Sequence, residues 1–191
     1  MIHTPCILFA GGKSSRMGRD KSLLPFGGAP TLIQYQYQRL LKIFSHVYIL
    51  TKDPNKYRFD AEFIHETDPL YSPVAGFCTL FEQKNDEAFF VLSVDTPFVT
   101  REIIDTLIKT HTTTFHATLA HSQKSLEPLC GVYSQSAYQC FRTMRTENRL
   151  ALKQIEQCNI QTVCFQELKP FTNINYPKDY QKALQSAIIQ P

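Results

Sequence analysis

The sequence predicts an α/β protein whose helices cover both faces of a doubly wound, mostly parallel sheet. Short apolar runs alternate with amphipathic stretches along most of the 191 residues. Strands that are joined through helices return in parallel by crossover connections. This alternation breaks between Phe115 and Tyr133, where two strands follow each other directly. We therefore expect a Rossmann-like sheet with one small antiparallel excursion.

The expected strands are short apolar runs with few polar interruptions, and the strongest of them is AFFVLSV. They cover residues 6–9, 47–50, 61–64, 88–94, 115–120, 129–133 and 161–165. Helical spacing of apolar residues predicts helices over residues 31–44, 74–84, 100–111, 134–144, 150–158 and 177–189. Thr100 and Ser134 are the expected N-caps of two of them, and Pro177 suits the first turn of the last helix. The length favours a single domain, residues 1–191.

Composition excludes several classes of protein. The net charge of +3 is too small to predict nucleic acid binding by itself. The chain has no run of about 18 apolar residues, so we expect no membrane span. Its N-terminus also lacks the features of a signal peptide, so we expect a cytoplasmic protein. The six cysteines form no C-x-x-C pair, which predicts buried reduced thiols and does not support a zinc site.

The stretch PCILFAGGKSSRMGRDKSLLPFGG holds the main functional signal. The first apolar run meets Gly11 and Gly12, and four cations follow. In an open parallel sheet, ligands bind beyond the carboxyl ends of the strands. Glycine lets backbone N–H groups approach an anion closely, and lysine and arginine neutralise phosphate charge. The stretch is therefore a candidate cradle for several phosphates. The cations are Lys13, Arg16, Arg19 and Lys21.

Two familiar phosphate-binding loops do not fit this stretch. A P-loop requires Gly-Lys-Ser/Thr at its end, but Gly18 is followed by Arg19 and Asp20. The dinucleotide fingerprint G-x-G-x-x-G is also absent. On the glycines and charges alone, the alternative is a solvated basic loop with turn glycines. That alternative applies most strongly to Lys13 and Arg19.

The pattern A-G-G-x-S-x-R-M-G-x-D-K-x-L-L resembles the opening loop of the nucleotidyltransferases that make molybdenum cofactor dinucleotides. Its form is most similar to the guanylyltransferase branch, since the cytidylyltransferase branch typically begins with two alanines and one glycine. The resemblance implies a fold like that of nucleotide-diphospho-sugar transferases. The matching residues are Ala10, Gly11, Gly12, Ser14, Arg16, Met17, Gly18, Asp20, Lys21, Leu23 and Leu24.

Four later segments extend the resemblance to the rest of the chain, in the family's order. SPVAGF resembles the G-P-L-A-G segment, with Ser72 in place of its first glycine. SVDTPFV is similar to the D-x-P motif after the central strand, EPL to a segment on the acceptor side, and NINYP to a late N-x-N-x-P element. Residues 1–100 then form mainly the nucleotide-binding half and residues 101–191 mainly the acceptor-binding half.

The resemblance implies transfer of GMP from GTP to the phosphate of molybdopterin, with or without molybdenum, and release of pyrophosphate. Asp95 follows the strongest strand, and a carboxylate there suits Mg²⁺. The resemblance makes it the metal ligand, whereas the alternative is that it caps the helix near Thr100. Lys21 is implied to hold the triphosphate together with Arg16. Backbone groups of Phe9, Ala10, Gly11 and Gly12 are implied to contact the nucleotide.

Recognition of the base and of the acceptor is less determined. The family commonly has a polar residue, often asparagine, where Leu50 and Thr51 stand. Glu66 and Asp68 are both candidates for a carboxylate that accepts hydrogen bonds from guanine. We expect Gly76 to let the chain pass close to the base or ribose. Asn173 and Asn175 are implied to contact the acceptor or the phosphates; alternatively they are turn residues before the last helix.

Other readings of the sequence remain. The same fold serves cytidylyl transfer to molybdopterin and transfer to other phosphate acceptors, and a non-catalytic module that binds GTP or a pterin is a further possibility. For the guanylyltransferase we expect GTP and molybdopterin as partners, and no nucleic acid or membrane. We also expect transient contact with molybdoenzymes or cofactor-delivery proteins, and a monomer or weak oligomer.

Overall fold

A computed structural model describes residues 1–12 and 15–188 of the chain. Its strands form one seven-stranded sheet in the order β3-β2-β1-β4-β6-β5-β7. Strand β6 runs antiparallel to both of its neighbours, and the remaining strand pairs are parallel. The expected fold class, with its single antiparallel excursion, is thereby confirmed. The strands are β1 Cys6–Phe9, β2 Val47–Thr51, β3 Glu62–His65, β4 Ala88–Ser93, β5 Ala117–His121, β6 Leu126–Ser134 and β7 Ile160–Cys164.

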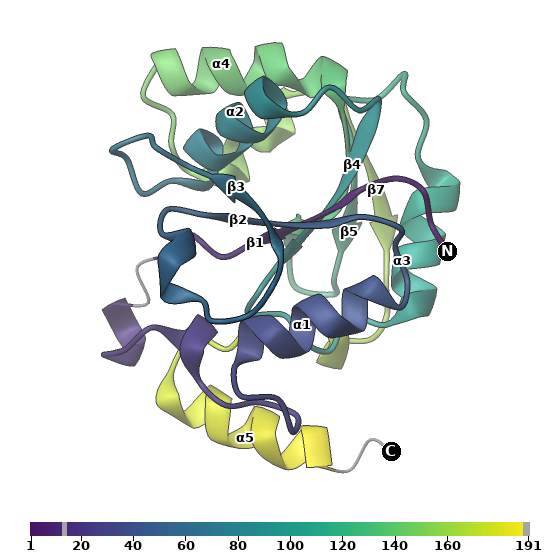
Figure 1. The fold of residues 1–191 in the computed structure, drawn as a ribbon. Coiled ribbons are helices and arrows are strands. Elements are labelled where there is room, and N and C mark those ends of the chain that lie inside the picture. The colour runs from purple at the N-terminus through teal and green to yellow at the C-terminus, as the bar shows by residue number, and fades with distance from the viewer. Residues whose placement is uncertain (13–14, 189–191) are drawn as a thin grey trace.

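Helices cover both faces of the sheet (Figure 1). The helices α1 (Leu32–Leu41), α3 (Arg101–Thr110) and α5 (Pro177–Ile188) lie on one face, and α2 (Pro73–Gln83) and α4 (Tyr138–Thr146) lie on the other. Each face has its own apolar core, because alternate residues of the strands point to opposite sides. Thus Cys6 and Leu8 belong to one core, and Ile7 and Phe9 to the other.

Side-chain caps mark the starts of three of the predicted helices. The side chain of Thr100 accepts a hydrogen bond from Ile103 N, and Ser72 and Thr31 cap α2 and α1 in the same way. The prediction for Ser134 was wrong. Its hydroxyl donates to Phe115 O, so it joins the end of β6 to the loop between α3 and β5, and the short 3-10 turn Gln135–Ala137 precedes α4.

The prediction of a helix over residues 150–158 needs correction. Residues Leu152–Gln157 form a 3-10 helix, η5. Ala151 stands at its N-cap position and provides no side-chain hydrogen bond to the first turn. A short segment without a cap gains little from the α-helical hydrogen-bond pattern, which favours the tighter turn.

The prediction of buried reduced thiols was wrong for three of the six cysteines, since two are bridged and Cys164 is exposed. Cys140 on α4 and Cys158 after η5 form a disulfide, with their Cα atoms 6.2 Å apart. This separation lies in the range that a bridge can span. Cys6, Cys78 and Cys130 are buried free thiols as expected, and Cys164 is an exposed one. Packing of α4 against the end of η5, rather than any spacing in the sequence, brings the pair together.

The connections at the carboxyl ends of β1, β2 and β4 meet along one edge of the sheet. Parallel register aligns Phe9 with Leu50 and with Ser93, so the residues that follow these strands are neighbours. The segment before α5 also reaches this edge, since Ile174 N donates to Asp95 O over 2.9 Å. Within residues 1–12 and 15–188, none of the helices is long and apolar enough to cross a membrane.

Candidate active site

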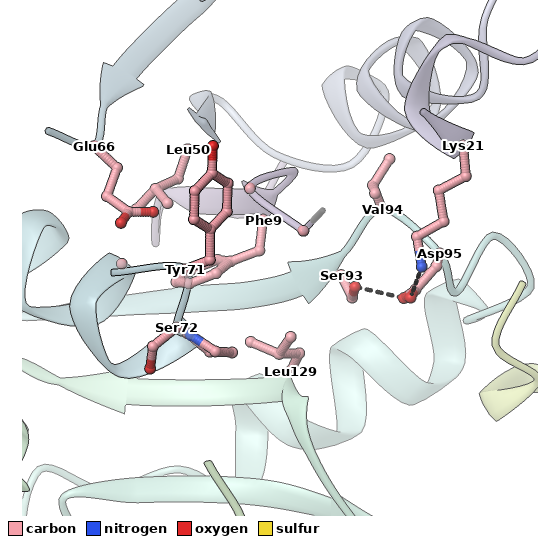
Figure 2. A pocket seen from close by; sticks show the side chains of 14 residues that line it. Phe9, Lys21, Leu50, Glu66, Tyr71, Ser72, Ser93, Val94, Asp95 and Leu129 are labelled. Atoms are coloured by element: carbon pink, nitrogen blue, oxygen red, sulfur yellow. Dashed lines mark hydrogen bonds and ion pairs between the residues drawn. The ribbon is translucent and has the colours of Figure 1, made fainter. Parts of the chain in front are cut away.

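A pocket of about 310 Å³ opens at this edge of the sheet (Figure 2). Lys21 and Asp95 stand at one end of it, while Glu66, Leu50, Phe9 and Tyr71 gather at the other. Its location matches the rule that ligands bind beyond the carboxyl ends of parallel strands. The lining residues are Phe9, Gly11, Gly12, Lys21, Leu50, Glu66, Tyr71, Ser72, Pro73, Gly76, Ser93, Val94, Asp95 and Leu129.

The Asp95 carboxylate is held at both oxygens. Lys21 Nζ lies 2.5 Å from Oδ2, and Ser93 Oγ donates to Oδ1 over 2.5 Å. Lys21 Nζ also donates to Ile174 O, 3.2 Å away. The first loop, the end of β4 and the segment before α5 therefore converge on one carboxylate. The structure brings together Lys21 and Asp95, which sequence reasoning had placed in one site.

The first loop contributes unequally to the pocket. Gly11 and Gly12 line it with their backbone. The backbone of Phe9 and Ala10 is engaged in the sheet, because Phe9 O accepts from Val94 N and Ala10 N donates to Leu50 O. Phe9 lines the pocket with its ring instead. Phe9 O and Ala10 N therefore already have hydrogen-bond partners in the sheet, which limits the predicted backbone contacts of these residues with a nucleotide.

The arginines of the first loop lie outside this pocket. Arg16 is exposed, and its guanidinium carbon lies 6.0 Å from the centre of the Tyr176 ring. Arg19 is also exposed, as the solvated alternative predicts. Lys13 and Ser14 fall outside the described residues. The role of Arg16 at the phosphates stays a prediction.

Glu66 lies at the far end of the pocket and is nearly buried, with 4% of its surface exposed. Lys52 Nζ lies 2.6 Å from its Oε1. Its Oε2 faces Gly11, where a Cβ would stand 3.4 Å from that oxygen. Burial raises the pKa of Glu66 above its usual value, and Lys52 opposes that shift. One oxygen is thus fixed by a lysine, and the other is turned toward the loop that borders the pocket.

Asp68 points away from this pocket. Its carboxylate accepts hydrogen bonds from Arg145 Nε over 2.8 Å and from Leu70 N over 2.8 Å. It lines a separate hollow between α2 and α4. Of the two carboxylates that the sequence left open, the structure places only Glu66 at the pocket, and Asp68 connects the loop after β3 to α4.

Apolar side chains line the part of the pocket beside Glu66. A Cβ on Gly76 would lie 3.0 Å from the ring of Phe9 and 3.2 Å from Leu50, so any larger residue there would force one of these side chains to shift. The close neighbours of Gly76 are thus Phe9 and Leu50, and the expected approach to a base or ribose stays a prediction. The ring of Tyr71 stands at the entrance, 57% exposed, and Lys52 Nζ lies 4.8 Å from its centre.

A second pocket, of about 470 Å³, adjoins the first. The two share Pro73, Ser93, Asp95 and Leu129, so Asp95 stands between them. Asn173 lines this second pocket, whereas Asn175 lines neither and donates its backbone N–H to Asp179. The remaining lining residues are Thr96, Ser125, Leu126, Glu127, Pro128, Cys130, Leu152, Lys153, Glu156 and Phe171.

Comparison with known proteins identifies the family. The family model described as a MobA-like NTP transferase domain matches residues 6–159. The chain belongs to the MobA-like NTP transferase family. It is 32% identical over 188 residues to a Helicobacter pylori protein named molybdenum cofactor guanylyltransferase, which covers 95% of this chain and 88% of the relative. A Campylobacter jejuni protein of the same name is 30% identical over 182 residues, with 93% of each chain covered.

Solved structures agree with the fold of this MobA-like domain. Molybdopterin-guanine dinucleotide biosynthesis protein A from Archaeoglobus fulgidus superposes with a TM-score of 0.83 at 21% identity and covers 97% of this chain and 99% of its own. A 2-C-methyl-D-erythritol 4-phosphate cytidylyltransferase from Thermus thermophilus gives a TM-score of 0.72 at 16% identity, with 99% and 100% covered. The fold is thus one that nucleotidyltransferases share.

Sequence reasoning missed several residues that shape the site of this MobA-like domain, among them Lys52, which pairs with Glu66, and the pocket residues Tyr71 and Ser93. Lys52 follows β2 and Glu66 follows β3, and the parallel pairing of Thr51 with His65 places them side by side. The two strands were expected to end at residues 50 and 64, one residue before their observed ends. The contact between Lys52 and Glu66 therefore could not be recognised. Ser93 opens the segment SVDTPFV and Tyr71 directly precedes SPVAGF, but neither side chain was singled out by the resemblance. A strand register would have been needed to identify Lys52.

Proposed function

We propose that this protein transfers GMP from GTP to the terminal phosphate of molybdopterin and releases pyrophosphate. The observation that carries the proposal is the position of Asp95, which borders both pockets. A nucleotide in the first pocket and an acceptor phosphate in the second would meet at this carboxylate. The relatives named molybdenum cofactor guanylyltransferase supply the identity of the two substrates.

Glu66 supports guanine as the base. A carboxylate accepts two hydrogen bonds side by side, and guanine offers N1–H and the 2-amino group in that arrangement. Cytosine offers no such pair. The apolar surfaces of Phe9 and Leu50 lie beside Glu66 and suit the face of a planar base. This combination favours GTP over CTP in the first pocket.

Lys21 and the backbone of Gly11 and Gly12 lie where the triphosphate of such a nucleotide would extend. Lys21 supplies a positive charge. The glycines have no side chain, so a phosphate can approach their backbone N–H groups closely. Phosphoryl transfer depends mainly on positioning and on neutralising the charge that develops. An acceptor phosphate oxygen forms a bond to the α-phosphorus of GTP, and the bond from that phosphorus to the bridging oxygen breaks. The acceptor is already ionised, so no general base is required.

Mg²⁺ is the metal that we propose for this site. It binds through one or two carboxylates together with substrate phosphates, and Asp95 supplies a carboxylate where both phosphates would meet. When bound, the ion would neutralise charge on the phosphates. Ser93 orients the Asp95 carboxylate through Oδ1, and Lys21 balances its charge in the free protein.

The test is release of pyrophosphate from molybdopterin mixed with GTP, CTP or ATP, with and without Mg²⁺. We expect Mg²⁺-dependent release of pyrophosphate from the mixture of molybdopterin and GTP, and none from the mixtures with CTP or ATP. The Asp95→Asn variant should lose this release and keep its thermal unfolding transition. Release with CTP alone would keep the nucleotidyltransferase site but overturn the assignment of the base. Binding of GTP without release from any mixture would indicate a non-catalytic module and overturn the proposal.

A further inference from the structure

The second pocket contains a carboxylate whose two oxygens have different surroundings. Glu127 Oε1 accepts hydrogen bonds from Ser122 Oγ over 2.8 Å and from Ser125 Oγ over 3.4 Å. Within the part of the chain that the structure describes, no hydrogen bond ends on its Oε2. Glu127 is half-buried and lines the pocket. One oxygen is therefore anchored, and the other is left for a ligand.

The turn between β5 and β6 holds that anchor in place. The Ser122 hydroxyl is almost fully buried and accepts the N–H groups of Lys124 and Ser125, over 3.3 Å and 3.2 Å. With both amides bound to its oxygen, the hydroxyl proton is directed elsewhere, and Glu127 Oε1 is one of its acceptors. A short turn and a buried hydroxyl thus fix the orientation of Glu127 before any ligand binds.

The walls around Glu127 suit a planar ring. Leu129, Leu152 and Phe171 provide apolar surface, and the pocket's volume of about 470 Å³ is in the range of sites for small organic ligands. A ring that lies against apolar walls needs its polar edge matched by a few fixed groups. Burial raises the pKa of Glu127, while hydrogen bonds from Ser122 and Ser125 lower it. Paired N–H donors from a ligand would favour the charged carboxylate.

We propose that Glu127 recognises the 2-amino-4-oxo edge of a pterin acceptor and so determines which ring system this enzyme accepts. A pterin presents a ring N–H and a 2-amino group side by side, which is the donor pair that guanine also offers. The inference rests on the proposed function, because it names the group that selects the acceptor of that reaction. Two carboxylates, Glu66 in the first pocket and Glu127 in the second, then read equivalent edges of the two substrates.

Fluorescence titration with 6-hydroxymethylpterin and with 6-hydroxymethyllumazine tests this inference, since lumazine carries an oxygen in place of the 2-amino group. We expect the whole chain to bind the pterin at least about tenfold more tightly than the lumazine, as a lost hydrogen bond to a charged group predicts. Glu127→Gln should remove that preference. Glutamine keeps an oxygen for the Ser122 bond, so the turn stays intact.

Glu167→Gln is the matched control, because Glu167 is an exposed glutamate that lines neither pocket. It should leave the preference for the pterin unchanged. In steady-state assays, Glu127→Gln should raise KM for molybdopterin about tenfold or more and leave KM for GTP unchanged. A kcat that stays within about threefold of the original value would show that the loss lies in binding.

The outcomes separate this inference from the proposed function. Equal binding of the two rings by the unaltered chain, or a preference that survives in Glu127→Gln, overturns the role of Glu127. Pyrophosphate release from GTP and molybdopterin would still support guanylyl transfer in that case. Absence of release with every nucleotide would instead overturn the proposed function.

Discussion

Lys21 and Asp95 lie 74 positions apart in the sequence, yet the Lys21 ammonium rests 2.5 Å from Asp95 Oδ2. Only 14% of each side chain is exposed. The pair joins the loop after β1 to the end of β4, at the carboxylate where both pockets meet. A cation that can reach this point is suitably placed to neutralise phosphates that bind there.

Lys21→Met is expected to lower kcat/KM for GTP by about a hundredfold or more. Removal of one pre-positioned charge at a reacting phosphate costs about 3 kcal/mol in comparable sites. Pyrophosphate release at varied GTP concentrations measures the loss. Arg19→Met is the control, because Arg19 is an exposed cation of the same loop. Equal losses in the two variants would show that only the net charge of the loop matters.

Glu66→Gln and Asp68→Asn are expected to differ sharply in their effect on KM for GTP. Glu66 faces the pocket, so its loss should raise KM about tenfold or more, as expected when a charged hydrogen-bond partner is removed. Asp68 pairs with Arg145, and both side chains are partly exposed. Its loss should cost about 1 kcal/mol of stability or less and leave KM unchanged. A larger KM effect in Asp68→Asn would reverse this assignment.

The disulfide predicts a count of thiols. Protein unfolded without reductant should show four reactive thiols, and six after reduction, because Cys140 and Cys158 are joined. In the native protein, Cys164 should react first since it is exposed. Burial raises the pKa of Cys78 to about 11, which leaves little thiolate for reaction near neutral pH. Six thiols without reductant would contradict the bridge.

The bridge is also expected to stabilise the fold. It closes a loop with a sequence separation of 18, for which loss of chain entropy in the unfolded state is worth about 3 kcal/mol. Cys158→Ser should lower the free energy of unfolding by about that amount, measured in urea without reductant. Cys164→Ser is the matched control and should change it little. Equal unfolding free energies for Cys158→Ser and the original protein would show that the bridge adds no stability.

Asp20 is expected to make stability depend on pH at the acid end. Burial alone raises its pKa, but hydrogen bonds from Lys56 and Ser22 outweigh burial and hold the pKa below its usual value. Because the pKa of Asp20 is lower in the folded state, its charge stabilises the fold at every pH above the unfolded-state pKa of 3.8. This stabilisation is lost as the pH falls through the folded-state pKa. Asp20→Asn should therefore cost about 1 kcal/mol near neutral pH and progressively less as the pH falls below about 4.

Urea unfolding of the two proteins at stepwise lower pH measures this dependence. Lys56→Met should flatten the same part of the curve, because its ammonium lies 2.7 Å from Asp20 Oδ2. If the unfolding free energies of Asp20→Asn and the original protein differ by the same amount at every pH, the charge of the carboxylate does not contribute to stability.

The sequence by itself determined the features that depend on neighbouring residues. Apolar runs and caps such as Thr100 defined most elements, because local hydrophobic period and capping chemistry act over a few positions. The position of Asp95 after the strongest strand, and the glycines after β1, also followed from chain order, since consecutive elements of this fold class place those points at one sheet edge.

Only the tertiary structure decided the features that join distant residues. It placed Glu66 at the pocket with Lys52 and turned Asp68 toward Arg145, because the register of β2 and β3 sets which residues meet beyond them. Packing of α4 against η5 likewise paired two cysteines that the sequence left as separate thiols. The position of Asp95 between the two pockets also depends on tertiary packing, because residues from distant segments line each pocket. Sequence patterns report local preference, whereas register and packing are settled when all the elements bury their apolar faces together.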